Sequence, residues 1–486
     1  MRTSLKAIAG SASCVATVAF FVVGVAACGP HHAADDERTV APPAAWSYTV
    51  TADADLTTLD VKACVGTPRA KRLMPGREAA RAYLLAAPRP DGAGCFVYRV
   101  DLVALVSDAG AARRAYASSD VRIITTGDWL WRPRRVPKDT EATITFALPD
   151  GIQVTTPWPA DGNTTASFRL NHGAFQWKNQ VALGRFETAA FSVAGGNIDV
   201  VFLDGAKSVD NAAITSWLSR VSETVSDFYG RFPARHATVF VIPVGPGVDP
   251  VHFGYVLRGG GPSITLLLNT EANRDDLEGD WVALHEMFHL GMPPIEASAP
   301  WLYEGVTMYY TEVLRARGGF VSPATAWQKL HEGFERGVAN SNANASLGAA
   351  SAAMHSSKRY RWVYWGGAAI AFEADLRLRR TSGGARSLDT QMRYMFEASY
   401  DAHHRTWAAD EIIALLDASD PTDTFGTVSQ RTLRQSGFPD ITPIYRWLGL
   451  NASADSLSLL KTPEAVAMRR AILTGKAVKT RSSDDF

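Results

Sequence analysis

The chain has 486 residues, which is long for one hydrophobic core and favours two domains with peripheral segments. Hydrophobic residues make up 46% and charged residues 20%, the proportions of an ordinary soluble globular protein. Lys plus Arg and Asp plus Glu both number 49, and no basic stripe stands out, which argues against nucleic acid as a partner.

The first residues predict export. Arg2 and Lys6 precede an apolar stretch over 8–27, the pattern of a secretory signal. The stretch ends in Val-Ala-Ala-Cys, which resembles the lipobox of bacterial lipoproteins. That resemblance implies removal of residues 1–27, a lipid on Cys28 as the only membrane attachment, and a place in the bacterial cell envelope, at the outer membrane or cell surface. An uncleaved signal anchor is the alternative, because about 20 apolar residues can also span a bilayer.

Two cysteines remain after the predicted signal and lipid anchor. Cys64 and Cys95 would sit in an oxidising compartment, where one disulfide is their simplest use. Two buried free thiols are the alternative. Neither cysteine lies near the histidines of the motif below, so zinc ligation by sulfur is disfavoured.

The composition and the residue pattern of the chain change along its length. Residues 28–45 are polar and Pro-rich, which predicts a flexible tether. Over 46–205, short runs of β-branched and aromatic residues between turn residues predict an antiparallel β-sandwich, with a helical insert at 111–117.

From 206 to 450 the pattern is mainly helical. It begins with an amphipathic helix that Gly230 ends, followed by a strand and by a hairpin or edge strand over 254–269. Residues 451–486 should form one helix and a frayed tail.

The chemistry-bearing motif is His285-Glu286-Met287-Phe288-His289. On a helix, residues four apart share a face, so both imidazoles can reach one zinc ion. Glu286 could then accept the proton of a metal-activated water as general base. Asp275 and Asp276 are the expected N-terminal caps of this helix.

A third ligand follows in the segment Trp301-Leu302-Tyr303-Glu304-Gly305. Glu304 falls at the start of a helix that Pro300 opens. A carboxylate on a second helix completes a His-His-Glu zinc site, with one zinc per chain. Taken alone, Glu304 could be a helix-start glutamate favoured by the helix dipole.

The pairing of these two motifs resembles the gluzincins, and the wider sequence is similar to the glycyl-aminopeptidase family. The resemblance implies a β-sandwich before a mainly helical, thermolysin-like zinc peptidase domain. It also matches Tyr364-Trp365-Gly366-Gly367 and Ser387-Leu388-Asp389 to family motifs, and it implies that Tyr364 hydrogen-bonds the oxyanion of the tetrahedral intermediate. Packing of Tyr364 into the core is the alternative.

One departure from the family concerns the substrate strand. The family shows a Glu after three glycines, whereas Gly259-Gly260-Gly261 is followed here by Pro262 and Ser263. The Glu that would bind a free substrate amine is missing, so both aminopeptidase and endopeptidase action stay open. The substrate is expected to add a strand to 263–268.

Three further residues are candidates for supporting roles. Thr311 and Glu312 could be hydrogen-bond partners of a zinc histidine. His355 falls in a stretch of low complexity that predicts a mobile loop, where it could take part in substrate handling.

The sequence therefore predicts a zinc metallopeptidase acting on peptides or proteins. Two alternatives remain: a catalytically silent surface binding protein on a peptidase fold, and a zinc hydrolase of a non-peptide substrate. Because the zinc ligands and the general base are all present, the enzyme is preferred.

Overall fold

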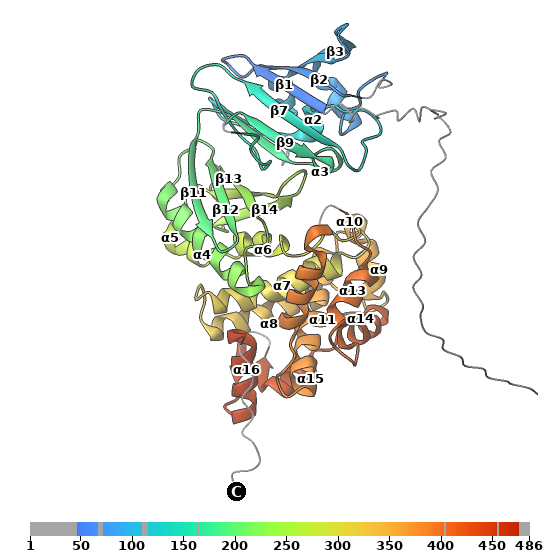
Figure 1. The fold of residues 1–486 in the computed structure, drawn as a ribbon. Coiled ribbons are helices and arrows are strands. Elements are labelled where there is room, and N and C mark those ends of the chain that lie inside the picture. The colour runs from blue at the N-terminus through green and yellow to red at the C-terminus, as the bar shows by residue number, and fades with distance from the viewer. Residues whose placement is uncertain are drawn as a thin grey trace, which may run out of the picture. The chain divides into compact units, whose positions relative to one another are not determined.

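The computed structural model describes residues 46–66, 71–108, 115–162, 165–402, 405–453 and 456–475. All of them belong to the compact unit Ala44–Phe486. A β-rich N-terminal region precedes a mainly helical C-terminal region, as predicted (Figure 1). The predicted signal peptide, tether and Cys28 lie outside the described residues. None of the described helices combines the length and the apolar character that a bilayer crossing demands.

The first sheet has six strands in the order β3-β4-β2-β1-β7-β9. Strand β1 pairs antiparallel with β2 but parallel with β7, so the prediction of a purely antiparallel fold is wrong here. Apolar residues alternate in the same way in parallel and antiparallel strands, so the sequence could not distinguish the two kinds of pairing. The strands are β1 (Trp46–Ala52), β2 (Thr58–Cys64), β3 (Leu84–Pro90), β4 (Phe96–Asp101), β7 (Glu141–Ala147) and β9 (Ser167–Asn171).

The two remaining cysteines join neighbouring strands of this sheet. Cys64 is the last residue of β2 and forms a disulfide with Cys95, which directly precedes β4. Because β2 and β4 pair antiparallel, the two residues lie beside each other at one end of that pair.

A second sheet of four strands, β5-β6-β10-β8, contributes to the same hydrophobic cluster as the first. The predicted helical insert at 111–117 is wrong for Ala115–Ala117, which form strand β5, and residues 111–114 lie outside the described residues. The strands are β5 (Ala115–Ala117), β6 (Val121–Thr125), β8 (Gln153–Thr155) and β10 (Gln180–Gly184). The short helices of this region are η1 (Glu78–Tyr83), α1 (Leu102–Ser107), α2 (Thr126–Trp129) and α3 (His172–Gln176).

The third sheet has the order β11-β12-β13-β15-β14. Strand β12 pairs parallel with β13 through the crossover helix α4, so β11 and β12 belong with the strands that follow and not with the β-rich region that was predicted to reach residue 205. Within the described residues, strand β14 pairs with β15 alone, so it forms one edge of the sheet and β11 forms the other. The elements are β11 (Glu187–Val193), β12 (Gly196–Phe202), α4 (Asn211–Tyr229), β13 (His236–Gly245), β14 (Val251–Leu257) and β15 (Ser263–Asn269).

Helices make up most of the remaining chain. The prediction of a mobile loop around His355 is wrong. This stretch forms two short helices, and the Ser346 hydroxyl caps the first of them. The elements are α5 (Arg274–Glu278), α6 (Val282–His289), α7 (Pro300–Arg317), α8 (Pro323–Asn340), α9 (Leu347–Ala352), α10 (Met354–Ser357), α11 (Tyr360–Thr381), α12 (Leu388–Ser399), η3 (Tyr400–Ala402), α13 (Ala409–Asp417), α14 (Thr424–Arg434), α15 (Thr442–Leu448), β16 (Leu450–Ser453), β17 (Ser456–Leu459) and α16 (Pro463–Thr474).

A buried ionic network joins α7, α11 and α12. Asp375 accepts hydrogen bonds from Tyr309 at 2.7 Å and from Arg379 at 3.0 Å. Asp389 accepts from Tyr310 at 3.0 Å and from Arg379 at 3.0 Å. Burial raises the pKa of Asp389, but neighbouring arginines outweigh burial and hold it below its ordinary value. The Asp of the Ser-Leu-Asp motif is thus a structural anchor of the helical region.

The turn between β14 and β15 is anchored in the β-rich region. The amide of Asn179, which is fully buried, donates to the carbonyl oxygens of Gly259 at 3.0 Å and Gly261 at 2.6 Å. Gly260 has a φ of +84°, and a Cβ there would lie 2.7 Å from Trp158. The glycine run is therefore a docking turn whose backbone lies directly against the β-rich region.

The neighbouring residue extends this anchorage into the edge strand. Gln180 is also fully buried, donates to the Tyr255 hydroxyl at 2.9 Å and accepts from Thr265 at 2.5 Å. Since Tyr255 lies on β14, the β-rich region sets the position of that strand.

Candidate active site

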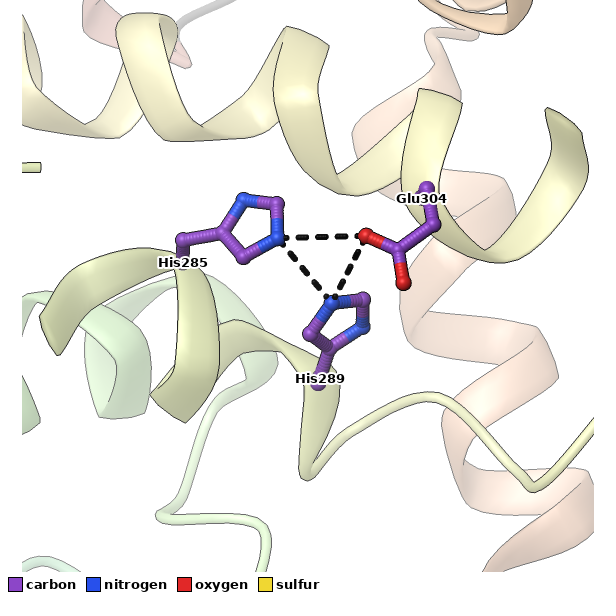
Figure 2. A group of neighbouring side chains, drawn as sticks. All are labelled: His285, His289 and Glu304. Atoms are coloured by element: carbon purple, nitrogen blue, oxygen red, sulfur yellow. Dashed lines mark hydrogen bonds and ion pairs between the residues drawn. The ribbon is translucent and has the colours of Figure 1, made fainter. Parts of the chain in front are cut away.

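Helix α6 brings the two predicted histidine ligands together. His285 and His289 point from one face of α6 toward Glu304 on α7 (Figure 2). The two Nε2 atoms are 3.1 Å apart, and Glu304 Oε2 lies 3.3 Å from Nε2 of His285 and 3.5 Å from that of His289. A tetrahedral zinc ion with bonds of about 2.0–2.1 Å places its ligand atoms about 3.3 Å apart. The three atoms fit zinc.

The imidazole tautomers support the same conclusion. Thr311 Oγ1 lies 3.2 Å from Nδ1 of His285, and Thr307 Oγ1 lies 3.2 Å from Nδ1 of His289. Each threonine hydroxyl donates its hydrogen to the carbonyl four residues earlier, Tyr303 for Thr307 and Thr307 for Thr311. When both imidazoles are neutral, the hydroxyls accept from Nδ1–H and the two Nε2 lone pairs face each other. A cation between them removes this repulsion.

The charges of Glu304 and His289 also suit a metal. Burial lowers the pKa of His285, but the hydrogen bond to Glu304 and the charges of nearby glutamates outweigh burial and raise it. Burial raises the pKa of Glu304, but the two histidines outweigh burial and bring it below its ordinary value. Burial is the main reason that the pKa of His289 falls to about 4. An ionised carboxylate and a neutral imidazole are the forms that bind a metal.

The start of α6 differs from the prediction. Asp275 and Asp276 belong to the separate helix α5 and do not cap α6. The Asp280 carboxylate instead accepts backbone N–H groups of Val282 at 2.7 Å and Val251 at 3.3 Å. Burial raises the pKa of Asp280 to about 7. These two bonds join the start of α6 to the start of β14.

Glu286 lies where strand β14 approaches α6 most closely. A Cβ on Gly254 would lie 2.8 Å from Glu286 Cγ and 2.6 Å from Val282 Cγ1, so only glycine leaves room for both. Burial raises the pKa of Glu286 to about 7, with the charge of Glu304 adding to the shift and His285 opposing it. A carboxylate with such a pKa is suited to accepting a proton near neutral pH.

Tyr364 reaches the site from α11. Its side chain lines the same cleft as Glu304. Burial, followed by the charges of Glu304 and Glu286, raises the pKa of its hydroxyl, so the hydroxyl keeps its proton. The approach depends on two glycines. A Cβ on Gly305 would collide with the backbone of Gly367, and a Cβ on Gly367 would collide with a carbonyl of α7.

These residues line one cleft of about 290 Å³. Its walls are β14, α6, α7 and α11, and the lining residues are His252, Phe253, Gly254, Tyr255, Val256, Trp281, Val282, His285, Glu286, His289, Tyr303, Glu304 and Tyr364. The cleft thus combines three side chains that could hold a metal ion with the carboxyl group of Glu286 and the hydroxyl of Tyr364.

Several supporting predictions differ from the structure. Glu312 pairs with Arg315 at 2.6 Å, whereas Thr311 contacts His285, one of the two predicted histidine ligands. The sequence missed Thr307, although its position three residues after Glu304 puts both on one helical face. His355 contacts Tyr360 with rings 6.0 Å apart and does not line the cleft.

The predicted substrate strand is also wrong. Residues 263–268 belong to β15, which lies between β13 and β14 and has strand partners on both sides. The edge strand that lines the cleft is β14. Two apolar runs separated by a glycine turn look alike in sequence, and only the pairing shows which is the edge.

Comparison with known proteins supports the predicted resemblance. The family model of the M61 glycyl aminopeptidases matches residues 293–369, which include Glu304 and Tyr364. No curated protein sequence matches the chain.

Solved structures share the fold. An aminopeptidase N family protein from Idiomarina loihiensis is similar with a TM-score of 0.66 and 17% identity, over 83% of this chain and 78% of that chain. An M1 zinc metallopeptidase from Deinococcus radiodurans is similar with a TM-score of 0.51 and 13% identity, over 81% of this chain and 94% of that chain. A two-domain M1 zinc metallopeptidase bound to L-arginine has a TM-score of 0.52 and 12% identity, over the same shares of 81% and 94%.

We expect the site to bind one zinc ion per chain. Removing a histidine's hydrogen-bond partner should weaken zinc binding by about 10- to 100-fold, so Thr311→Val and Thr307→Val should each do so. Glu304→Gln should weaken it more, because it replaces a charged ligand. Chelator competition on the refolded and as-purified protein measures the affinities.

Thr224→Val is the matched control, because the Thr224 hydroxyl also donates to a helical carbonyl four residues earlier but contacts no histidine. Zinc affinity that is unchanged in both Thr307→Val and Thr311→Val would contradict the assigned role of these hydroxyls.

We expect Gly367→Ala to separate α7 from α11. Overpacking of this kind costs about 1–3 kcal/mol in the free energy of unfolding, although alanine normally stabilises a helix interior. Urea unfolding measures the loss. The control is Gly279→Ala, where φ is −80° and the nearest atom to a Cβ is 3.5 Å away. Equal stability of the two variants would show that the helices do not touch at Gly367.

Proposed function

We propose that this protein is a zinc-dependent peptidase that hydrolyses peptide bonds in peptides or proteins. The observation that carries the proposal is the convergence of His285, His289 and Glu304 in one cleft with Glu286 and Tyr364. The M61 family match and the peptidases among the fold neighbours support it.

The metal site determines what the cleft can do. His285, His289 and Glu304 would hold the ion as two neutral imidazoles and one carboxylate, leaving a fourth position for water or substrate. Zinc, when bound there, would supply a Lewis acid that polarises a water molecule and the scissile carbonyl.

Glu286 moves the proton. Its carboxylate accepts the proton of the attacking water and then passes this proton to the nitrogen of the leaving amine. The close packing of Gly254 against its Cγ holds the side chain in place, so one group serves both steps.

Tyr364 stabilises the charge that develops on the substrate. Its protonated hydroxyl is near Glu304 and can turn to donate to the oxygen of the former carbonyl. Donors aimed at such an oxyanion lower the barrier because the surroundings are already oriented.

Strand β14 orients the substrate. Its outer edge has no strand partner within the described residues, and an extended peptide can pair with it as an added strand. The anchorage of β14 by Gln180 and Asp280 would keep this edge at a constant distance from Glu286.

Exchange of the proton acceptor should remove turnover and spare the metal. Glu286→Gln should lower kcat by about 10²–10⁴-fold, and Tyr364→Phe by about 10²–10³-fold, because each removes an interaction of the transition state. Hydrolysis of a peptide library by zinc-loaded protein, followed by mass spectrometry, measures both. Zinc content should stay at the wild-type level, and a Glu286→Gln variant with normal turnover would exclude Glu286 as the base.

We also propose that the chain is anchored in the bacterial envelope by a lipid on Cys28, with the sequence as the only support. Metabolic labelling with a radioactive fatty acid should mark the wild type and not Cys28→Ser. Labelling of both would contradict the proposal.

A further inference from the structure

Exposed aromatic side chains gather around the cleft. In the described part of the chain, four aromatic residues are largely exposed: Phe253 at 37%, Trp281 at 38%, Tyr360 at 38% and Tyr394 at 47%. Phe253 and Trp281 line the cleft. The ring of Tyr360 lies 6.5 Å from that of Tyr364, which also lines it. Exposed aromatic surface next to a reactive site is typical of a binding surface for apolar groups.

Phe253 and Trp281 belong to the cleft lining, and Tyr360 lies beside the lining residue Tyr364. Phe253 is on the edge strand β14, Trp281 precedes α6, and Tyr360 begins α11. The Trp281 ring contacts the His285 ring edge-on at 5.4 Å, so it lies directly beside the metal site. Apolar substrate side chains close to the scissile bond would therefore meet aromatic surface.

The cleft offers no spare negative charge. Of its lining residues only Glu286 and Glu304 are acidic, and one is assigned to proton transfer and the other to the metal. Strand β14, with the sequence Val-His-Phe-Gly-Tyr-Val-Leu, contains no acidic residue. A free α-ammonium group that is taken out of water needs a carboxylate partner, because an unpaired charge in such a site is costly. An amide nitrogen within a chain carries no such cost.

On the premise that the proposed peptidase function is correct, we propose that the site hydrolyses bonds inside peptide chains or next to blocked N-termini, between apolar side chains, and does not release free N-terminal residues. Phe253 and Trp281 are the specificity-determining residues. They would contribute binding that is equal in the ground state and the transition state, so their loss should raise KM and leave kcat unchanged.

The test compares matched peptides on the zinc-loaded full-length chain. One fluorogenic, internally quenched peptide with Phe and Leu at its centre is prepared with a free and with an acetylated N-terminus, and a third version carries Asp and Gly at the centre. We expect similar kcat/KM for the first two, with one central cleavage seen by mass spectrometry. The third should be at least about tenfold slower, because apolar pocket contacts contribute factors of this size.

Variants locate the effect. The double variant Phe253→Ala/Trp281→Ala should raise KM for the apolar peptide by at least about tenfold and leave kcat little changed. Tyr394→Ala, which removes a more exposed aromatic on α12 outside the cleft lining, is the control and should behave as wild type.

Three outcomes overturn the inference. Stepwise release of N-terminal residues that acetylation abolishes would leave the zinc peptidase function intact and exclude the proposed substrate class. Unchanged KM in the double variant would exclude the aromatic residues as specificity determinants. A zinc-loaded protein that cleaves none of the peptides, nor a free aminoacyl anilide, would refute the peptidase function itself.

Discussion

The close contact between α7 and α11 at Gly305 and Gly367 is the constraint on which the candidate site depends. At this point the two helix backbones touch, because neither residue has a Cβ. Glu304 directly precedes Gly305, and Tyr364 lies almost one turn before Gly367, so the contact that joins the helices also brings the carboxylate and the hydroxyl together. The buried network around Asp389 joins the same two helices further along, through Tyr310 of α7 and Arg379 of α11.

Helix α7 supports the proposed metal site in two ways. It provides Glu304 as the proposed third ligand, and from the same face it provides the hydroxyls of Thr307 and Thr311, which contact the two histidines of α6. These positions are three and seven residues beyond Glu304, which on a helix form one continuous stripe. Glu304 and the two hydroxyls therefore move together with α7. A displacement of α7 relative to α6 would disturb the carboxylate and both imidazoles together.

The β-rich region takes part in the site without lending a side chain to the cleft lining. Asn179 and Gln180 place two buried amides against the turn and strands of the β14–β15 hairpin, where their hydrogen bonds are satisfied by carbonyl and hydroxyl groups. A buried amide that lost these partners would cost free energy, so the position of the hairpin is strongly determined. Since β14 is the wall that a peptide would meet, the β-rich region acts on the substrate through this strand.

The sequence by itself determined the local chemistry: the histidines four residues apart, Glu304 at a helix start, and a β-rich half before a helical half. Periodicity and spacing are local properties, and a helix converts them directly into a shared face. Only the tertiary structure decided which strand is the edge, that β12 pairs with β13, and that Thr307 faces a histidine while Glu312 faces an arginine. These outcomes depend on pairings between segments that are distant in the chain. The residue types alone are compatible with other strand orders and other side-chain partners, and the packing of the whole chain selects among them.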